Sequence, residues 1–127
     1  SDVYKRQREK FSVSPEREKA FDMVRQFYVL VDNHFKEKKM VQDYADMLHR
    51  SPKTLSNLFT TCGLPSPLRI IHERIEAEAK RLLLYSQKSA KEITEILGFE
   101  DQATFSRFFK KMTGESVSEY RKREKRE

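Results

Sequence analysis

Apolar residues along this chain recur at steps of three and four, the spacing of α-helices that bury one face. The pattern is longest in two segments, residues 20–35 and 68–83. The first stripe consists of Ala20, Val24, Phe27, Tyr28, Val31 and Phe35, and the second of Leu68, Ile71, Ile75, Ala79, Leu82 and Leu83. In the second segment, charges of both signs (Arg69, Glu73, Arg74, Glu76, Glu78, Lys80 and Arg81) lie between the apolar positions. The pattern therefore predicts two long helices, the second with a solvated face of balanced charge.

Two kinds of local signal mark where helices begin. Serine followed by proline at 14–15, 51–52 and 66–67 is typical of an N-cap and a first helical residue, because the missing N–H of proline costs nothing there. Ser89 with Glu92, and Ser116 with Glu119, have the spacing of a capping box. These signals predict an all-α fold of about seven helices, the shorter ones at residues 41–48, 52 onward, 90–97, 102–112 and 116 onward.

The segments on either side of the second long helix repeat one another. The matching positions are Leu55 with Phe105, Ser56 with Ser106, Leu58 with Phe108 and Phe59 with Phe109. The shorter helices before them match at one residue less, so the second turn is one residue longer. The repeat predicts two helix-turn-helix subdomains joined by a long central helix. The expected organisation is a linker or tail at 1–13, the first subdomain with its leading helix at 14–66, the linking helix at 67–86, and the second subdomain with a C-terminal helix at 87–127.

The first residues carry a separate signal. Asp2 to Gln7, DVYKRQ, resembles the peptide encoded by a transposon end that is used in sequencing libraries. We therefore treat these residues as a processing artefact and leave them out of the fold prediction.

Composition restricts the classes of partner and of function. The formal net charge of +6 and a pI near 9.5 favour an anionic partner, namely nucleic acid, an acidic protein or a membrane surface. No apolar run is long enough to span a bilayer. A single cysteine, Cys62, excludes an intrachain disulfide and favours the reducing cytoplasm, where the chain would associate with the nucleoid. The three histidines are scattered and no phosphate loop is present, so we expect no enzyme, no metal and no cofactor.

The second helix of each repeat has one apolar face and one polar face, which is the pattern of a DNA recognition helix. The residues expected at or near base edges are Lys53, Ser56, Asn57, Gln102, Ala103, Thr104, Ser106 and Arg107, and those expected at phosphates are Thr60, Lys110 and Lys111. Arg107 is the best candidate for a base contact, because its planar fork can donate twice to a guanine edge. The alternatives for Arg107 are a phosphate or a neighbouring carboxylate. The linking helix of about 19 residues spans roughly 28 Å, close to the roughly 34 Å between successive major grooves.

One stretch resembles a known family. Residues 98–122, GFEDQATFSRFFKKMTGESVSEYRK, are similar to the signature of the AraC/XylS family of bacterial transcription regulators, and the resemblance extends from Phe27 to Lys122. It implies a seven-helix domain with two helix-turn-helix units. It places Lys53, Ser56 and Asn57 in the first recognition helix and Gln102, Ala103, Thr104, Ser106 and Arg107 in the second. Many members also contact RNA polymerase, and many carry an N-terminal effector-binding or dimerisation domain.

The first unit departs from the family pattern. His49 stands in the turn where a small residue or glycine is common, Asn57 stands where arginine is frequent, and Gly63 arrives one residue early. We therefore expect weaker base contacts from the first unit, and a turn role with a solvated ring for His49. The sequence predicts the output domain of a transcription regulator that binds double-stranded DNA sequence-specifically, with no membrane partner. The alternative is a helical protein-interaction module without sequence-specific DNA binding.

Overall fold

The computed structural model describes residues 14–125, which form seven α-helices and no strand. The transposon-like residues 2–7 and the predicted linker at 1–13 lie outside the described residues. The helices are α2 (Pro15–His34), α3 (Val41–Met47), α4 (Pro52–Thr61), α5 (Pro67–Tyr85), α6 (Ala90–Ile96), α7 (Gln102–Thr113) and α8 (Val117–Lys125). The all-α prediction is confirmed, and each predicted helix is present within a residue or two of its expected ends.

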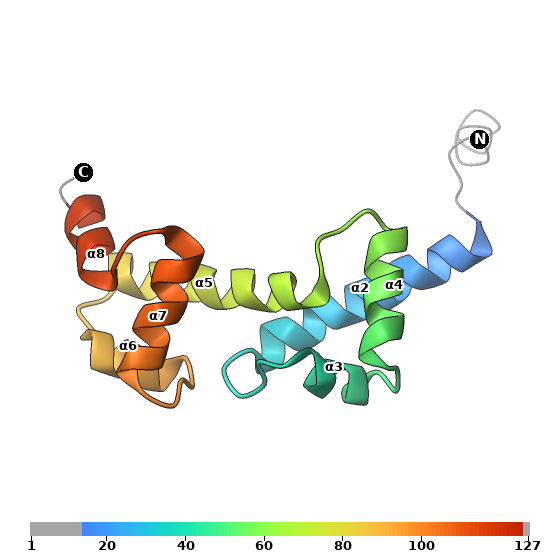
Figure 1. The fold of residues 1–127 in the computed structure, drawn as a ribbon, viewed down its shortest axis with the longest axis horizontal. Coiled ribbons are helices and arrows are strands. Elements are labelled where there is room, and N and C mark those ends of the chain that lie inside the picture. Colours follow the sequence, from blue (N-terminus) through green and yellow to red (C-terminus); the bar gives the residue numbers. More distant parts are fainter. Residues whose placement is uncertain (1–13, 126–127) are drawn as a thin grey trace, which may run out of the picture.

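The molecule is elongated along α5, which lies between two helical groups (Figure 1). Helices α2, α3 and α4 pack at one end of α5, and α6, α7 and α8 pack at the other. Helices α4 and α7 run nearly parallel and lie on the same face of the molecule. Leu48 to Ser51 connect α3 to α4, and Leu97 to Asp101 connect α6 to α7, so the second turn is one residue longer, as the repeat predicts.

The helices begin where the serine signals predict. Ser14, Ser51 and Ser66 each accept a hydrogen bond from the backbone N–H three residues later, at 3.1–3.2 Å, with proline in the first turn. Both capping boxes form, since Glu92 and Glu119 accept from the backbone N–H groups of Ser89 and Ser116. These bonds satisfy donors that an α-helix leaves free at its start.

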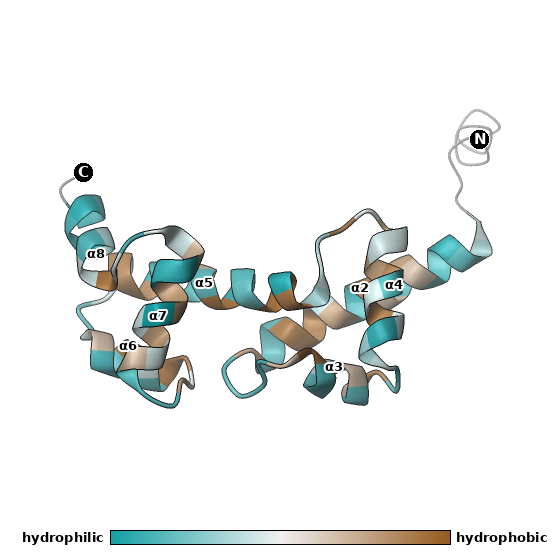
Figure 2. Cartoon of the chain, viewed as in Figure 1, coloured by the Kyte–Doolittle hydropathy of each residue, from teal (hydrophilic) through white to brown (hydrophobic). Residues whose placement is uncertain are grey.

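Aromatic side chains fill the interior of both helical groups. Phe27 of α2 lies 5.4 Å from Tyr44 and 5.0 Å from Phe59 between ring centroids. At the other end, Phe109 lies 6.1 Å from Phe105 and 5.4 Å from Tyr120. Buried aliphatic residues of α5 continue the core between the two groups: Ile70, Ile71, Ile75, Ala79, Leu82 and Leu83. Figure 2 shows the hydrophobic colour on the inward faces of the helices and the hydrophilic colour outside.

An arginine of α8 binds the carbonyl groups at the end of α5. Arg121 donates from Nε to the carbonyl oxygen of Leu83 at 3.0 Å and from Nη2 to that of Ser86 at 3.3 Å. The last carbonyls of a helix have no partner within the helix, so these bonds satisfy acceptors that α5 cannot satisfy itself. Arg121 therefore adds a polar attachment between α8 and the end of α5 to the apolar packing of these helices.

Three predicted positions are wrong, two of them in the apolar stripes. Leu68 is 44% exposed, because it lies in the first turn of α5 beside an open hollow with Lys111 and Met112, and Ile70 is buried in its place. Tyr28 is 39% exposed, since it lies at the edge of the α2 stripe with its ring stacked on Phe59.

The third correction concerns Glu78, which was expected on the solvated face of α5. Its side chain is buried, and its carboxylate accepts a hydrogen bond from Arg81. That hydrogen bond is the main reason why the pKa of Glu78 lies below its ordinary value, and the charges of Arg81, Arg74 and Lys36 add to the effect. The nearby positive side chains allow a carboxylate to remain ionised in this buried position.

Candidate nucleic-acid interface

The predicted binding residues lie on α4 and α7, the two helices that share one face of the molecule (Figure 1). Only Thr104 and Ser106 are half-buried. The exposed positions are Lys53, Ser56, Asn57 and Thr60 on α4, and Gln102, Ala103, Arg107, Lys110 and Lys111 on α7. The fold therefore presents two polar helix surfaces on one face of the molecule, one near each end of α5.

The start of α7 is held by an aspartate. Asp101 accepts a hydrogen bond from the backbone N–H of Thr104 at 2.7 Å. This bond is the largest reason why the pKa of Asp101 lies below its ordinary value, and the charge of Arg107 lowers it further. Arg107 itself donates from Nη2 to the hydroxyl of Thr104 at 3.3 Å, so its exposed guanidinium lies along the first half of the helix.

Three phenylalanines fix the rotation of α7 about its own axis. Phe105 and Phe109 are fully buried, and Phe108 is half-buried against the core. The ring of Phe108 lies 5.3 Å from Phe99 in the preceding turn and 5.3 Å from His72 on α5. Because this side of α7 is packed, the opposite side with Arg107 faces solvent.

Helix α4 is similar in placement but differs in its polar groups. The hydroxyl of Thr60 donates to the backbone carbonyl of Ser56 at 3.0 Å, and that of Thr61 donates to the carbonyl of Asn57 at 2.9 Å. A phosphate contact by Thr60 therefore requires its hydroxyl to rotate away from the helix backbone. Lys53 is the one charged residue of α4, whereas α7 carries Arg107, Lys110 and Lys111.

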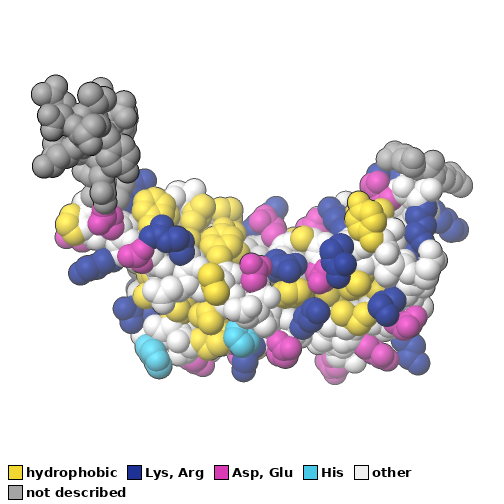
Figure 3. All heavy atoms as spheres, turned by 180° about the vertical axis from the view of Figure 1, so that it is seen from behind, with side chains coloured by type: hydrophobic (Ala, Val, Ile, Leu, Met, Phe, Trp, Pro, Cys, Tyr) yellow, Lys and Arg dark blue, Asp and Glu magenta, His cyan; other side chains and the backbone are white. Residues whose placement is uncertain are grey.

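The basic residues of α7 are available for an external partner. The ion pairs among residues 14–125 do not involve Arg107, Lys110 or Lys111. Those pairs join residues outside α7. Two of them, Arg69 with Glu73 and Lys80 with Glu76, lie along α5, both at 2.8 Å. On the opposite side of the molecule, positive and negative side chains are interspersed (Figure 3).

A hollow of about 290 Å³ lies between the first turns of α5 and the end of α7. His72 lines it together with Arg69 and Lys111. Burial lowers the pKa of His72, and the charge of Lys111 lowers it further, which favours the neutral imidazole. The apolar pattern of α5 gives no signal for this histidine, because only the fold brings it beside Lys111 and Phe108.

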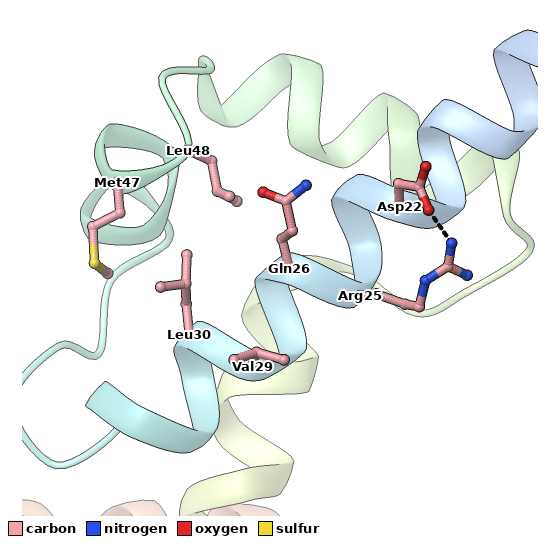
Figure 4. Close-up of a pocket in the computed structure, with 7 residues that line it drawn as sticks. All are labelled: Asp22, Arg25, Gln26, Val29, Leu30, Met47 and Leu48. Atoms are coloured by element: carbon pink, nitrogen blue, oxygen red, sulfur yellow. Dashed lines mark hydrogen bonds and ion pairs between the residues drawn. The ribbon is translucent and has the colours of Figure 1, made fainter.

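A larger groove of about 550 Å³ lies between α2 and α3 (Figure 4). Its apolar lining comes from Val29, Leu30, Met47 and Leu48, with Gln26 beside them and the Asp22–Arg25 ion pair at one end. None of the predicted binding residues lines this groove. Within residues 14–125, no cluster of histidine, cysteine or acidic residues could hold a metal ion, and no helix is long and apolar enough to cross a membrane.

Known proteins share both the sequence pattern and the fold. A family model described as "Helix-turn-helix domain" matches residues 44–123. The chain is 34% identical over 82 residues to the raffinose operon transcriptional regulatory protein RafR of Pediococcus pentosaceus, which covers 65% of this chain and 30% of RafR. It is 36% identical over 92 residues to the arabinose operon regulatory protein of Salmonella typhimurium, which covers 72% of this chain and 31% of that protein. The chain thus spans about a third of the length of these relatives.

Solved structures show the same arrangement of helices. The C-terminal domain of AraT, a response regulator from Geobacillus stearothermophilus, superposes with a TM-score of 0.71 at 28% identity, covering 87% of each chain. The DNA-binding domain of AdpA, solved in complex with a target DNA, has a TM-score of 0.62 at 23% identity and covers 80% of this chain and 88% of that one. With the matched family model and the two-unit fold, these findings show that the chain belongs to the AraC/XylS family as the helix-turn-helix DNA-binding domain of a transcription regulator.

Proposed function

We propose that this domain binds double-stranded DNA sequence-specifically, with α4 and α7 in successive major grooves on one face of the duplex. The observation that carries the proposal is the placement of two capped, polar-faced helices on the same side of α5. The 19 residues of α5 span roughly 28 Å, against the roughly 34 Å that separates adjacent major grooves. One chain thereby offers the two recognition helices that a dimer of single helix-turn-helix units would supply.

The second unit is the main source of base recognition. Arg107 is exposed, lies outside the ion pairs of the described residues and reaches along the first half of α7, which is the half that approaches base edges in this motif. Asp101 places a negative charge at the start of α7, which disfavours a phosphate there. A guanine edge is therefore the better partner for Arg107, and Gln102 is placed to pair with adenine. Ala103, Thr104 and Ser106 complete the surface toward the bases or the adjoining backbone.

Phosphate contacts come from the second half of α7 and from α4. Lys110 and Lys111 are exposed and one turn beyond the base-facing residues, so they neutralise phosphates at the edge of the groove. In the first unit, Lys53, Ser56 and Asn57 face the duplex with a single charge, and Thr60 adds a hydroxyl. We expect this unit to contribute a weaker and more water-mediated contact.

The proposal extends to the protein in which this domain works. The curated relatives are about three times as long as the matched stretch, which supports a parent protein with an N-terminal effector-binding or dimerisation domain. Family membership supports a second contact with RNA polymerase, and action in the cytoplasm at the nucleoid. The AdpA domain, solved with a target DNA, supports the same use of the shared fold.

Selection of bound sequences from a random duplex pool tests the proposal directly. We expect a preferred sequence with two protected regions about one helical turn apart, and an affinity that falls as salt rises because counterions are released from the duplex. Footprinting the selected duplex locates the two regions. Absence of salt-dependent binding to any duplex would overturn the proposal and favour a helical protein-interaction module, for which the α2–α3 groove offers an apolar surface.

A further inference from the structure

The two helix-turn-helix subdomains touch each other directly, away from α5. The contact joins the loop that follows α2, residues 35–39, to the turn between α6 and α7, at Gly98 and Phe99. Figure 1 shows the loop after α2 facing the turn that leads into α7. This contact is a second connection between the subdomains, off the axis of the helix that joins them.

Gly98 lies directly against the backbone of the first subdomain. Its backbone has φ +77°, and a Cβ placed on it would overlap the carbonyl oxygen of Lys36. The same Cβ would lie 3.0 Å from the Lys36 carbonyl carbon and 3.0 Å from Nζ of Lys39. Two of these three atoms belong to the backbone, so no side-chain movement relieves the overlap. Gly63 and Gly114 also have positive φ, +69° and +85°, but a Cβ on either would meet nothing within 4 Å.

Lys39 fills the remaining space between the two subdomains. Its ammonium donates to the carbonyl oxygen of Lys36 at 2.7 Å and lies 5.2 Å from the centre of the Phe99 ring. Lys39 is half-buried, so its ammonium is partly removed from water, and this burial lowers its pKa. A desolvated cation over an aromatic ring is a stronger contact than the same pair in water.

One side of the contact is packed on the recognition helix α7, and the other is held by the core of the first subdomain. Phe99 packs on Phe105 and Phe108 of α7, with ring centroids 5.4 and 5.3 Å apart. On the other side, the hydroxyl of Tyr44 of α3, whose ring lies 5.4 Å from Phe27 of α2, donates to the carbonyl of Lys38 at 2.6 Å. A displacement of α7 relative to the first subdomain would therefore be opposed at this contact.

The loop is also attached to the central helix. Phe35 is buried, and the guanidinium of Arg74 on α5 lies 4.3 Å from the centre of its ring. Arg74 in turn donates to Asp32 of α2 at 2.8 Å. A single helix permits its two ends to bend or twist against each other, whereas a second attachment away from its axis resists both movements.

We propose that Gly98, Lys36 and Lys39 form a brace that holds α4 and α7 at one separation and angle, and so determines which spacing of half-sites the domain accepts. The brace consists of these three residues together with the ring of Phe99, over which the Lys39 ammonium lies. The inference rests on the proposed function for its consequence in DNA recognition. The effective concentration of the second recognition helix at its half-site depends on how narrowly the brace restricts its position.

The first experiment measures affinity for the selected duplex and for versions with one base pair added or removed between the half-sites. Gly98→Ala is compared with Gly114→Ala, which introduces the same backbone strain in the same subdomain without an overlap. We expect Gly98→Ala to lose about tenfold or more in affinity for the native spacing, and to discriminate less between spacings, because the second contact loses its effective concentration. We expect Gly114→Ala to keep the wild-type spacing profile, that is, the dependence of affinity on the number of base pairs between the half-sites.

A second, milder variant tests the brace even if Gly98→Ala does not fold. Lys39→Met removes the ammonium but keeps a flexible chain of similar length, and creates no overlap. We expect a loss of about threefold in discrimination between spacings, the size of one cation–aromatic contact. Circular dichroism at the assay temperature verifies that each variant is helical. Equal spacing profiles for Gly98→Ala, Lys39→Met and Gly114→Ala would overturn the brace.

A measurement without DNA separates the brace from the proposed function. Spin labels at Asn57→Cys and Ala103→Cys, in a Cys62→Ser background, report the distance between α4 and α7 by pulsed electron paramagnetic resonance. We expect a narrow distribution that broadens with Gly98→Ala and stays narrow with Gly114→Ala. A narrow distribution in both variants would refute the brace even if DNA binds. A broadened one would support it even if no duplex is bound, in which case the proposed function alone fails.

Discussion

The two helix-turn-helix units share one plan but differ in charge and in the turn between their helices. The first recognition helix, α4, carries one positive residue, whereas α7 carries three. The turn of the first unit contains His49 at φ +56°, and the corresponding position of the second is Gly98 at φ +77°. The same backbone shape is thus built with a strained residue in one unit and with glycine in the other. The comparison indicates that the second unit is constrained by what it contacts, and the first only by its own turn.

The reason for the difference lies outside the turns. Gly98 approaches the backbone of Lys36 so closely that no side chain is accommodated. His49 is exposed, so its side chain extends into solvent and the left-handed conformation costs only backbone strain. Contact with another subdomain therefore selects glycine more strongly than turn geometry does.

The largest expected effect concerns the cores of the two units. Phe109→Ala should lower the free energy of unfolding by about 3–5 kcal/mol, because it empties a fully buried aromatic site. Phe59→Ala, the matching change in the first unit, should have a similar effect on the opposite end of the molecule. Amide hydrogen exchange should show faster opening in α6–α8 for the first variant and in α2–α4 for the second. Uniform acceleration in both would show that the two units unfold as one.

The next effect concerns base recognition. Arg107→Ala should cost about 1–3 kcal/mol of discrimination between the selected duplex and one with a changed base pair, because a bidentate contact to guanine is lost. Asn57→Ala in the first unit should cost less. Lys110→Ala serves as the control, since loss of a phosphate contact should weaken binding to all duplexes alike and reduce the salt slope by about 1. A larger effect from Asn57→Ala than from Arg107→Ala would reverse the assigned order of the two units.

A smaller effect is expected in the turn of the first unit. His49→Gly should raise the free energy of unfolding by about 0.5 kcal/mol, because relief of the left-handed strain exceeds the added entropy of the unfolded chain. Urea denaturation measures the change. Gly114→Ala, which introduces the same strain in open space, should shift stability in the opposite direction. Destabilisation by His49→Gly would show that the imidazole makes a contact that outweighs the strain.

The smallest effect is a local response to acid. The pKa values of Glu92, Asp101 and Glu119 lie below their ordinary values, because donors at Ser89, Thr104 and Ser116 bond to the carboxylates. The stabilisation is complete above the ordinary pKa values of 4.5 and 3.8 and is lost as pH falls through them toward the folded values. Helices α2 and α4 are capped by serines, which do not titrate.

Nuclear magnetic resonance from pH 6 down to pH 3 should therefore show the starts of α6, α7 and α8 fraying before those of α2 and α4. Glu92→Gln is the matched control, because it keeps a hydrogen-bond acceptor at the capping position without a titrating charge. Its α6 should lose the pH dependence. Simultaneous fraying of the serine-capped starts of α2 and α4 would contradict this assignment.

Most of the fold was predictable because its signals are local. Each Ser–Pro start and each capping box involves residues within three positions of one another, and each formed as expected. The exposed face of α7 followed from helical periodicity, since Phe105 and Phe109 are buried and Arg107 is not. The base and phosphate roles of the individual side chains remain predictions, because they depend on a partner.

What the sequence by itself determined is therefore the set of helices, the repeat and the polar faces of α4 and α7, all of which arise from spacing along the chain. The tertiary structure alone decided the exposure of Leu68, the burial of Glu78, the bonds from Arg121 to the end of α5, and the approach of Gly98 to Lys36. Most of these features join residues that are far apart in the chain. The exposure of Leu68 depends on which part of α5 is left uncovered by the other helices. Helical periodicity records which face of a helix is buried, but it carries no information about which distant backbone that face, or the turn beside it, will meet.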